Sequence, residues 1–272
     1  MSELDKFRME GKVALVTGGA GLLGAEFCRA LSEAGATVIA ADLDGGRAEG
    51  VAAGLRAQGR MVSAVRLDVT RPDSVSQVFE SLLAQHGRLD VLVNSAALDP
   101  KFDPSHHDKA ANAFEDYPLE MWNQALAVNL TGMFLCSQAA SRLMLEQGQG
   151  VIINICSTYG LVGPDQRIYE RPGKPKQFKP VYYSVTKSGV LGMTRYLATY
   201  FAGTGLRVNA LTPGGVFNDH DDGFVANYSA RTVLGRMARK DEMNGALLFL
   251  ASDASTYMTG ANLVVDGGWT AW

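Results

Sequence analysis

The chain has 272 residues, of which 47% are hydrophobic and 19% charged, and its formal net charge is −3. This composition excludes a chain that is disordered throughout, and a weakly acidic chain without a basic face is not expected to bind nucleic acid or a membrane surface. The polar first ten residues, three cysteines without paired spacing and the lack of an apolar run of about 20 residues predict a cytoplasmic protein.

Short apolar runs alternate with longer amphipathic stretches along the whole chain. This alternation predicts an α/β fold with a doubly wound parallel sheet of about seven strands and helices on both faces. A single domain over 1–272 accounts for it, since no repeat or linker interrupts the pattern. We expect strands at about 12–18, 37–42, 61–68, 89–95, 150–156, 207–212 and 261–265, and helices near 22–34, 45–58, 72–86, 118–147, 181–203 and 240–251.

Three segments break the rhythm, at about 98–117, 163–180 and 214–238. Each follows the carboxyl end of a predicted strand, which is the side where open α/β sheets bind ligands. We therefore expect these segments to border the substrate site. The alternative is that each is a solvated surface insertion.

A glycine-rich turn follows the first predicted strand. Gly18, Gly21 and Gly24 allow backbone N–H groups to approach a pyrophosphate at the start of the next helix, where Leu22 and Leu23 lie. The position between a strand and a helix strengthens the prediction of a dinucleotide site.

Asp42 ends the second predicted strand, 18 residues after Gly24. A carboxylate there accepts hydrogen bonds from ribose hydroxyls and repels a 2′-phosphate, and no basic residue stands at 41 or 43–46, so we expect NAD as the cofactor. The alternative is that Asp42 only caps the helix that begins near residue 45. Asp68, after the third strand, is a weaker candidate for a contact with adenine.

Tyr183 and Lys187 stand four residues apart, on one face of a predicted helix. A nearby cation favours the phenolate, which would make this tyrosine a usable acid and base. Taken alone, the pair could be an ordinary helix surface pair. It is accompanied by Ser157, at the end of a buried strand, by Asn129, inside the predicted helix 118–147, and by the turn from Asn94 to Ala97.

In their order and placement these motifs resemble the short-chain dehydrogenase/reductase family, from about residue 11 to 268. The resemblance also includes Asp68-Val69, Pro213-Gly214 and the closing Asp266-Gly-Gly268. It implies a sheet order of 3-2-1-4-5-6-7 and a homodimer or homotetramer. It further implies that Tyr183 is the acid/base, that Lys187 holds the nicotinamide ribose, that Ser157 orients the substrate oxygen and that Asn129 supports a proton path. The implied cofactor contacts include Val69, Asn94, Ala96, Tyr183, Lys187, Pro213, Gly214 and Val216.

The spacing of Gly18, Gly21 and Gly24 is more typical of the family's extended branch, because Leu22 replaces a glycine of the single-domain pattern. Only 85 residues follow Lys187, however, which is too few for that branch's substrate lobe, so we expect the single-domain branch.

The 163–180 segment holds five basic and two acidic residues and joins Ser157 to Tyr183. It predicts an anionic substrate such as a sugar phosphate or nucleotide sugar, although its lysines could instead face water or another subunit. Short motifs, among them Ser157-Thr-Tyr-Gly160, are similar to flagellin modification protein A and related sugar-modifying dehydrogenases. We expect no metal site, since His106 and His107 are adjacent and point in different directions. The alternatives to an NAD-dependent alcohol dehydrogenase are a cofactor-sensing protein of the same fold and an NADP-dependent carbonyl reductase.

Overall fold

The sheet of this protein has seven parallel strands in the order β3-β2-β1-β4-β5-β6-β7, in a computed structural model that describes residues 2–99, 112–171, 173 and 175–272. Both the number of strands and their order confirm the sequence-based expectation. The strands are β1 (Val13–Thr17), β2 (Thr37–Asp42), β3 (Val62–Arg66), β4 (Val91–Asn94), β5 (Gly150–Ile155), β6 (Leu206–Pro213) and β7 (Asn262–Val265).

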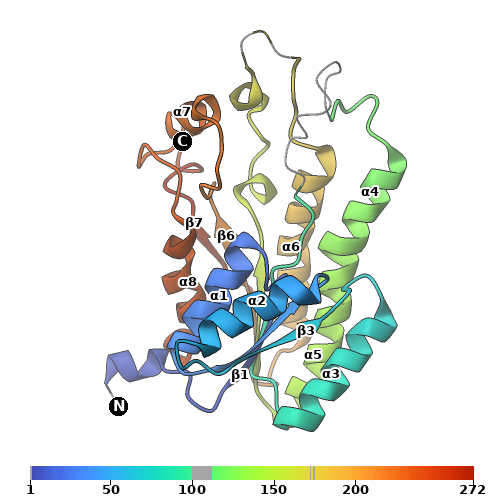
Figure 1. The fold of residues 1–272 in the computed structure, drawn as a ribbon, viewed down its shortest axis with the longest axis vertical. Coiled ribbons are helices and arrows are strands. Elements are labelled where there is room, and N and C mark those ends of the chain that lie inside the picture. Colours follow the sequence, from blue (N-terminus) through green and yellow to red (C-terminus); the bar gives the residue numbers. More distant parts are fainter. Residues whose placement is uncertain (1, 100–111, 172, 174) are drawn as a thin grey trace.

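Helices cover both faces of this sheet (Figure 1). Alternate strand residues point to opposite faces: Ala14 and Val16 of β1 belong to one apolar core, whereas Val13 and Leu15 belong to the other. The first core is closed by α1 (Leu22–Glu33), α2 (Gly45–Arg56) and α8 (Asn244–Ala251). The second is closed by α3 (Pro72–His86), α5 (Met133–Gln147) and α6 (Val181–Tyr200).

The helices differ from the sequence-based expectation in three places. The predicted helix 118–147 is divided into α4 (Leu119–Leu126), a π-helical turn at Ala127–Gly132 and α5. The predicted helix 240–251 begins as a 3-10 turn, Lys240–Met243, before α8. The third difference is α7 (Asp222–Ser229), an eight-residue helix that was not predicted because it is too short for a clear periodicity.

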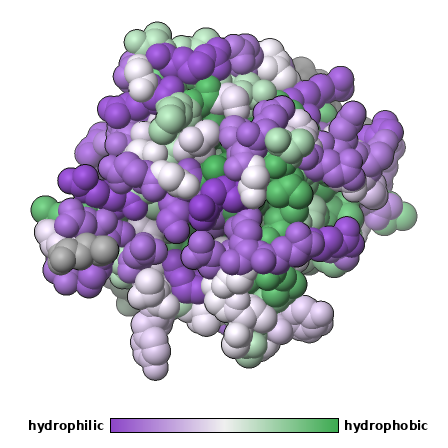
Figure 2. Space-filling view, turned by 90° about the horizontal axis from the view of Figure 1, so that it is seen from below, coloured by the Kyte–Doolittle hydropathy of each residue, from purple (hydrophilic) through white to green (hydrophobic). Residues whose placement is uncertain are grey.

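The segments that follow the carboxyl ends of the strands gather at one end of the molecule. In Figure 1, α7, residues 161–171 and 175–180 and the C-terminus all lie toward the top. The opposite end, seen from below in Figure 2, is mostly hydrophilic with one strip of hydrophobic residues. Within the described residues, no helix has both the length and the apolar character needed to cross a membrane.

Candidate active site

The glycine-rich turn between β1 and α1 is closed too tightly for side chains. Gly18 has φ +66°, and a Cβ atom there would lie 2.8 Å from the Ala96 Cα. A Cβ atom at Gly24 would lie 2.0 Å from the Gly18 carbonyl oxygen. These residues must therefore be glycines for the turn to form.

The first turn of α1 needs an external hydrogen-bond acceptor. Its N-cap is Gly21, which has no side chain to cap the helix, and Leu22 and Leu23 follow as the first helical residues. N–H groups in a first helical turn have no partner within the helix, and the helix dipole favours an anion there. The turn and the helix start together fit the pyrophosphate of a dinucleotide.

Asp42 lies beside this turn at the end of β2. Its half-buried carboxylate accepts hydrogen bonds from the backbone N–H of Ala20 at 3.0 Å and of Asp44 at 3.1 Å. The N-cap of α2 is Asp44, so the alternative in which Asp42 itself caps that helix is wrong.

A cation missed in the sequence lies near Asp42. The guanidinium of Arg47 donates to the Ala20 carbonyl oxygen at 3.0 Å. Arg47 stands just beyond the positions 41 and 43–46 considered above, and the first turn of α2 folds it back toward the glycine turn. The predicted preference for NAD rests on the negative charge of Asp42. The positive charge of Arg47 lies near that carboxylate.

Asp68 and Val69 follow β3 and are engaged within the chain. The Asp68 carboxylate accepts hydrogen bonds from the Thr70 N–H at 3.0 Å and the Thr70 hydroxyl at 2.6 Å. Val69 is buried, and a Cβ atom at Gly132 would lie 2.6 Å from its Cγ2. Their contacts with a cofactor stay a prediction.

The turn after β4 is fixed against the glycine turn. The Thr17 hydroxyl accepts hydrogen bonds from the N–H groups of Ser95 and Ala96, both at 3.1 Å. The Asn94 side chain points inward and donates to the Ser137 hydroxyl at 3.0 Å and the Asn154 side-chain oxygen at 2.9 Å. A contact between residues 94–96 and a cofactor would therefore use the backbone.

Asn129 lies in the π-helical turn, a feature that often marks functional sites. Its buried side-chain oxygen accepts from the Leu98 N–H at 2.7 Å, and its amide nitrogen donates to the Leu98 carbonyl oxygen and to the Thr186 hydroxyl, both at 3.2 Å. Thr186 precedes Lys187 on α6, so Asn129 lies behind the predicted acid/base pair.

Ser157, Tyr183 and Lys187 come together at the carboxyl end of β5. The Ser157 hydroxyl forms a hydrogen bond with the Tyr183 phenol. The Lys187 Nζ donates to the Ile155 carbonyl oxygen at 2.9 Å and lies 5.8 Å from the Tyr183 ring centroid. Gly160 permits this approach, because a Cβ atom there would lie 2.7 Å from the Lys187 carbonyl oxygen.

Burial raises the pKa of Tyr183 well above its ordinary value, and the charge of Asp99 raises it further. The hydrogen bond from Ser157 opposes both. Burial also lowers the pKa of Lys187, because an ammonium loses hydration in the interior. From the sequence, Lys187 is predicted to lower the pKa of the phenol, whereas in the structure desolvation is the largest effect on that pKa and raises it.

A second lysine lies over the ring of Tyr183. The Lys179 Nζ is 4.0 Å from the Tyr183 ring centroid and forms an ion pair with Asp99. Only 12% of the Lys179 side chain is exposed. Lys179 is one of the five basic residues of the 163–180 segment, and the sequence alone does not indicate that it lies at the site.

Three other basic residues of this segment, which the structure describes, form ion pairs. Arg167 pairs with Asp165 at 2.8 Å, Arg171 with Asp221 at 2.8 Å, and the exposed Lys176 approaches Glu170 at 3.9 Å. Lys174 lies outside the described residues. These pairs balance much of the positive charge from which an anionic substrate was predicted.

Aromatic side chains connect the segment to α7 and to the C-terminal residues. Tyr169 packs on Phe224 with ring centroids 5.6 Å apart, and its hydroxyl donates to that of Tyr159 at 3.1 Å. Tyr159 in turn meets Tyr183 edge to face at 6.4 Å. This cluster forms an apolar wall beside the phenol of Tyr183.

Pro213, Gly214 and Val216 lie where β6 ends. The Gly214 N–H donates to the Val265 carbonyl oxygen at 2.9 Å, and a Cβ atom at Gly214 would lie 2.7 Å from the Asp266 Cα. Val216 forms a parallel bridge with Ala238. These contacts fix the backbone of the segment, and its contact with nicotinamide stays a prediction.

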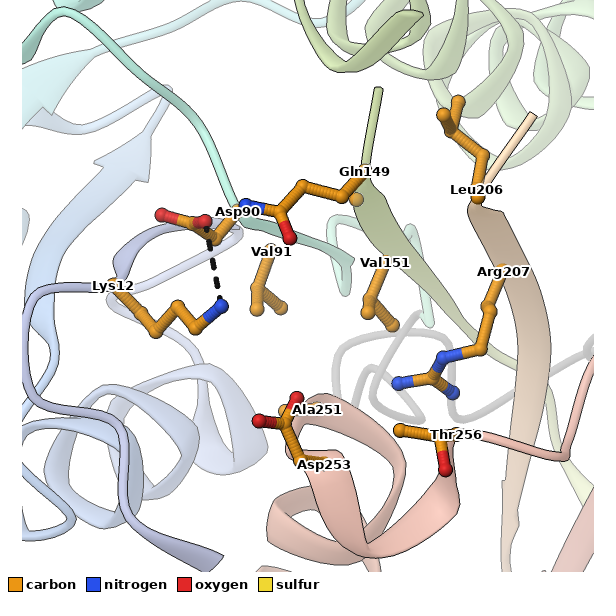
Figure 3. A pocket seen from close by; sticks show the side chains of 12 residues that line it. Lys12, Asp90, Val91, Gln149, Val151, Leu206, Arg207, Ala251, Asp253 and Thr256 are labelled. Atoms are coloured by element: carbon orange, nitrogen blue, oxygen red, sulfur yellow. Dashed lines mark ion pairs between the residues drawn. The ribbon is translucent and has the colours of Figure 1, made fainter. Parts of the chain in front are cut away.

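A separate pocket of about 270 Å³ lies at the amino ends of the strands (Figure 3). Its Lys12 pairs with Asp90 at 3.8 Å. Arg207 donates to the carbonyl oxygens of Ser252 and Met258, both at 3.2 Å. The cations of this pocket thus form contacts within the fold. The pocket lies at the amino ends of the strands, whereas open α/β folds bind ligands at the carboxyl ends.

Metal ligands do not gather in the part of the chain that the structure describes, where no group of three or more His, Cys, Asp or Glu side chains could hold an ion. His106 and His107, considered as metal ligands in the sequence, lie outside the described residues.

Comparison with known proteins agrees with this geometry. A family model described as Enoyl-(Acyl carrier protein) reductase matches residues 19–270. The chain is 38% identical to cis-4-hydroxycyclohexanecarboxylate dehydrogenase of Sinomonas cyclohexanicum, over 96% of this chain and 97% of the relative. It is 37% identical to D-threitol dehydrogenase of Mycolicibacterium smegmatis, over 97% of this chain and 95% of the relative.

Solved structures agree over their whole length. A short-chain type dehydrogenase/reductase from Mycobacterium marinum is 33% identical with a TM-score of 0.87, and each chain is covered completely. A gluconate 5-dehydrogenase from Burkholderia cenocepacia, in complex with NADP and tartrate, is 30% identical with the same TM-score and coverage. The chain belongs to the short-chain dehydrogenase/reductase family.

Proposed function

We propose that this oxidoreductase uses NAD to interconvert a secondary alcohol and a ketone on a small hydroxylated substrate. The observation that carries the proposal is the convergence of Ser157, Tyr183 and Lys187 at the carboxyl end of β5. The adjacent glycine turn fits a dinucleotide, and Thr17 and Asn129 connect that turn to α6 through residues 95–98.

Each residue has a separate task in this proposal. Ser157 donates a hydrogen bond to the substrate oxygen and orients it toward Tyr183, which takes up or returns the hydroxyl proton. Lys187 favours the phenolate and binds the nicotinamide ribose, while Asn129 fixes the backbone at Leu98 and the start of the proton path. The bound dinucleotide supplies the hydride acceptor or donor, and its oxidised ring adds a positive charge near the phenol.

NAD is the proposed cofactor because Asp42 places a carboxylate where the adenosine ribose would lie beside the glycine turn. One observation favours NADP as the alternative: Arg47 lies next to the same position, where it could meet a 2′-phosphate. The structure of the related gluconate 5-dehydrogenase contains NADP, which also supports this alternative. Titration with each dinucleotide distinguishes the two.

A sugar-derived alcohol or hydroxy acid is the proposed substrate. Three relatives named above act on D-threitol, gluconate and a hydroxycyclohexanecarboxylate, which share a secondary hydroxyl on a small polar molecule. The ion pairs of Arg167, Arg171 and Lys179 argue against a wide cationic site for a nucleotide sugar. Sugar phosphates and nucleotide sugars are included as substrates in the screen described next.

The test is a screen for reduced dinucleotide by its absorbance, with NAD and NADP each offered against polyols, sugar acids, sugar phosphates and nucleotide sugars. We expect turnover with NAD and a polyol or sugar acid. If the purified protein binds neither dinucleotide, the proposal is wrong.

Assembly and location complete the proposal. We propose a homodimer or homotetramer in the cytoplasm: α6 exposes the stacked rings of Tyr196 and Tyr200, which are 64% and 67% exposed, and the three cysteines are buried free thiols. Light scattering measures the assembly directly.

A further inference from the structure

The Asp99–Lys179 ion pair joins two segments that border the site. Asp99 follows β4, and Lys179 lies just before α6, at the end of the 163–180 segment. The two residues are 80 positions apart in the chain, yet their side chains form a hydrogen-bonded ion pair. The Lys179 Nζ of this pair lies over the face of the Tyr183 ring. A cation over an aromatic face is attracted to it.

The backbone on both sides of the pair is fixed. Leu98, next to Asp99, is held through its N–H and carbonyl groups by Asn129. The Lys179 N–H donates to the Gln166 side-chain oxygen at 2.8 Å, and the Phe178 carbonyl oxygen accepts from the Asn112 side chain at 3.2 Å. Hydrogen bonds within the chain therefore hold the pair in place, as a positioning element requires.

Charged and titratable groups face Tyr183 from several elements. Among the residues that the structure describes, two of these groups are cations, Lys179 in front of α6 and Lys187 on α6 itself, and one is an anion, Asp99 after β4. The others are neutral hydroxyl or thiol groups, namely Ser157, Cys156, Tyr159 and Tyr169. Among these charges, only Asp99 and Lys179 lie outside the family motifs quoted above.

We propose that the Asp99–Lys179 ion pair is a positioning element of the reaction, in which Lys179 stabilises the phenolate form of Tyr183 and Asp99 limits that effect. The inference rests on the proposed function, because it assigns the pair to the same proton transfer. An ammonium within about 4–6 Å of a phenol favours its ionised form, whereas a carboxylate nearby disfavours it. Lys179 need not contact substrate for this role, since it acts through the ring of Tyr183.

The two charges predict opposite changes, which a merely structural role would not produce. Removing the cation with Lys179→Met should move the acidic limb of the kcat–pH profile for alcohol oxidation to higher pH, by about one pH unit. On that limb this is roughly a tenfold loss of kcat. Removing the anion with Asp99→Asn should move the limb to lower pH. Lys179→Arg should keep the wild-type limb, and the double variant should lie close to it.

A second readout does not depend on turnover. A fluorotyrosine placed at position 183 reports its own ionisation through its fluorine resonance in the cofactor-free protein. Lys179→Met should move that titration to higher pH and Asp99→Asn to lower pH. Lys12→Met, which removes a lysine from the remote pair with Asp90, and Asp73→Asn, at an exposed position of α3, are the matched controls and should move neither readout.

The outcomes separate this inference from the proposed function. If both variants move the profiles in the same direction, or leave them unmoved while KM rises, the pair is structural or binds substrate and the inference is wrong. If Lys12→Met gives the same change as Lys179→Met, the effect is not local and the inference also fails. If the fluorine titrations move in opposite directions but no substrate is turned over, the electrostatic role stands and the proposed function fails.

Discussion

The side-chain amide of Asn129 forms two hydrogen bonds with the backbone of one residue, Leu98, at 2.7 Å from its N–H and 3.2 Å to its carbonyl oxygen. This double contact joins the π-helical turn to the chain that leaves β4. Because Leu98 precedes Asp99, these hydrogen bonds also hold the backbone next to the Asp99–Lys179 ion pair.

Asn129→Asp should weaken both the fold and turnover. A carboxylate can still accept from the Leu98 N–H, but it has no donor for the Leu98 carbonyl oxygen or the Thr186 hydroxyl. Leaving such buried groups unpaired costs about 1–3 kcal/mol, and we expect kcat to fall at least about tenfold, measured beside urea unfolding. Asn123→Asp, at an exposed position of α4, is the control. Unchanged stability and turnover in Asn129→Asp would show that the hydrogen bonds donated by the Asn129 amide are dispensable.

Tyr183→Phe should remove turnover and leave NAD affinity nearly intact, because only the transferable proton and one polar atom are lost. General acid–base groups contribute about 10²- to 10⁴-fold to a rate, so we expect a loss of that size in kcat. Steady-state kinetics and a fluorescence titration with NAD measure the two effects. Tyr257→Phe makes the same change at a fully exposed position and should behave as wild type. Normal kcat in Tyr183→Phe would refute the assigned role.

Gly24→Ala should disrupt the dinucleotide turn, because the added Cβ would lie 2.0 Å from the Gly18 carbonyl oxygen. The backbone must move to relieve this contact, at a cost of about 1–3 kcal/mol, and NAD affinity should fall at least about tenfold. Gly50→Ala, within α2, meets no atom within 4 Å and should instead stabilise the fold by about 0.4–1 kcal/mol. Thermal unfolding and NAD titration test both variants, and equal effects of the two would contradict the steric argument.

The sheet could be predicted from sequence because buried parallel strands are nearly continuous apolar runs. All five residues of β1 and all six of β5 are buried, and their alternate side chains enter opposite cores. The division of the predicted helix 118–147 could not be predicted, since a π-helical turn changes the hydrogen-bond spacing without a composition signal. α7 could not be predicted for a similar reason. Asp221 caps this helix, but its eight residues are too few for a clear hydrophobic periodicity.

At the site, local motifs were predictable and long-range pairs were not. Ser157, Tyr183 and Lys187 stand in recognisable spacings, and the structure brings them together. The partner of Lys179 lies 80 residues away, at Asp99, and no periodicity connects the two. The net charge of the 163–180 segment gives no sign of such pairs for the same reason, because Arg171 is paired by Asp221 from a distant part of the chain.

Asp42→Ser should change the cofactor preference. Without the carboxylate, a ribose loses its acceptor and a 2′-phosphate loses the charge that repels it, so kcat/KM should fall about tenfold for NAD and rise for NADP. Arg47 is the cation available to such a phosphate. Adding Arg47→Met to Asp42→Ser should therefore remove the gain with NADP, which initial rates with each dinucleotide would measure. A gain with NADP that persists in the double variant would exclude Arg47 as its source.

Asp165→Asn should weaken the attachment of the 163–180 segment in a pH-dependent way. Hydrogen bonds from Arg167 lower the pKa of Asp165 to about 2, and the charge of Arg231 contributes. A carboxylate with a lowered pKa stabilises the fold above its ordinary pKa near 4, and this contribution is lost as pH falls toward 2. Asn can still accept the hydrogen bond from the Arg167 N–H that caps the short helix Gln166–Tyr169. Its NH2 group replaces the oxygen that accepts from the Arg167 and Arg231 guanidinium groups, so the substitution removes the charge and those hydrogen bonds but keeps the cap.

Because solvent reaches both arginine partners of Asp165, whose side chains are 77% exposed in Arg167 and 40% in Arg231, we expect this variant to lose no more than about 1 kcal/mol at neutral pH. The difference in the free energy of unfolding from wild type should shrink between about pH 4 and pH 2, and added salt should reduce it further at neutral pH. Urea unfolding at a series of pH values measures it. A difference that stays constant down to pH 2 would mean that the packing of residue 165, rather than its charge, holds the segment on Arg231.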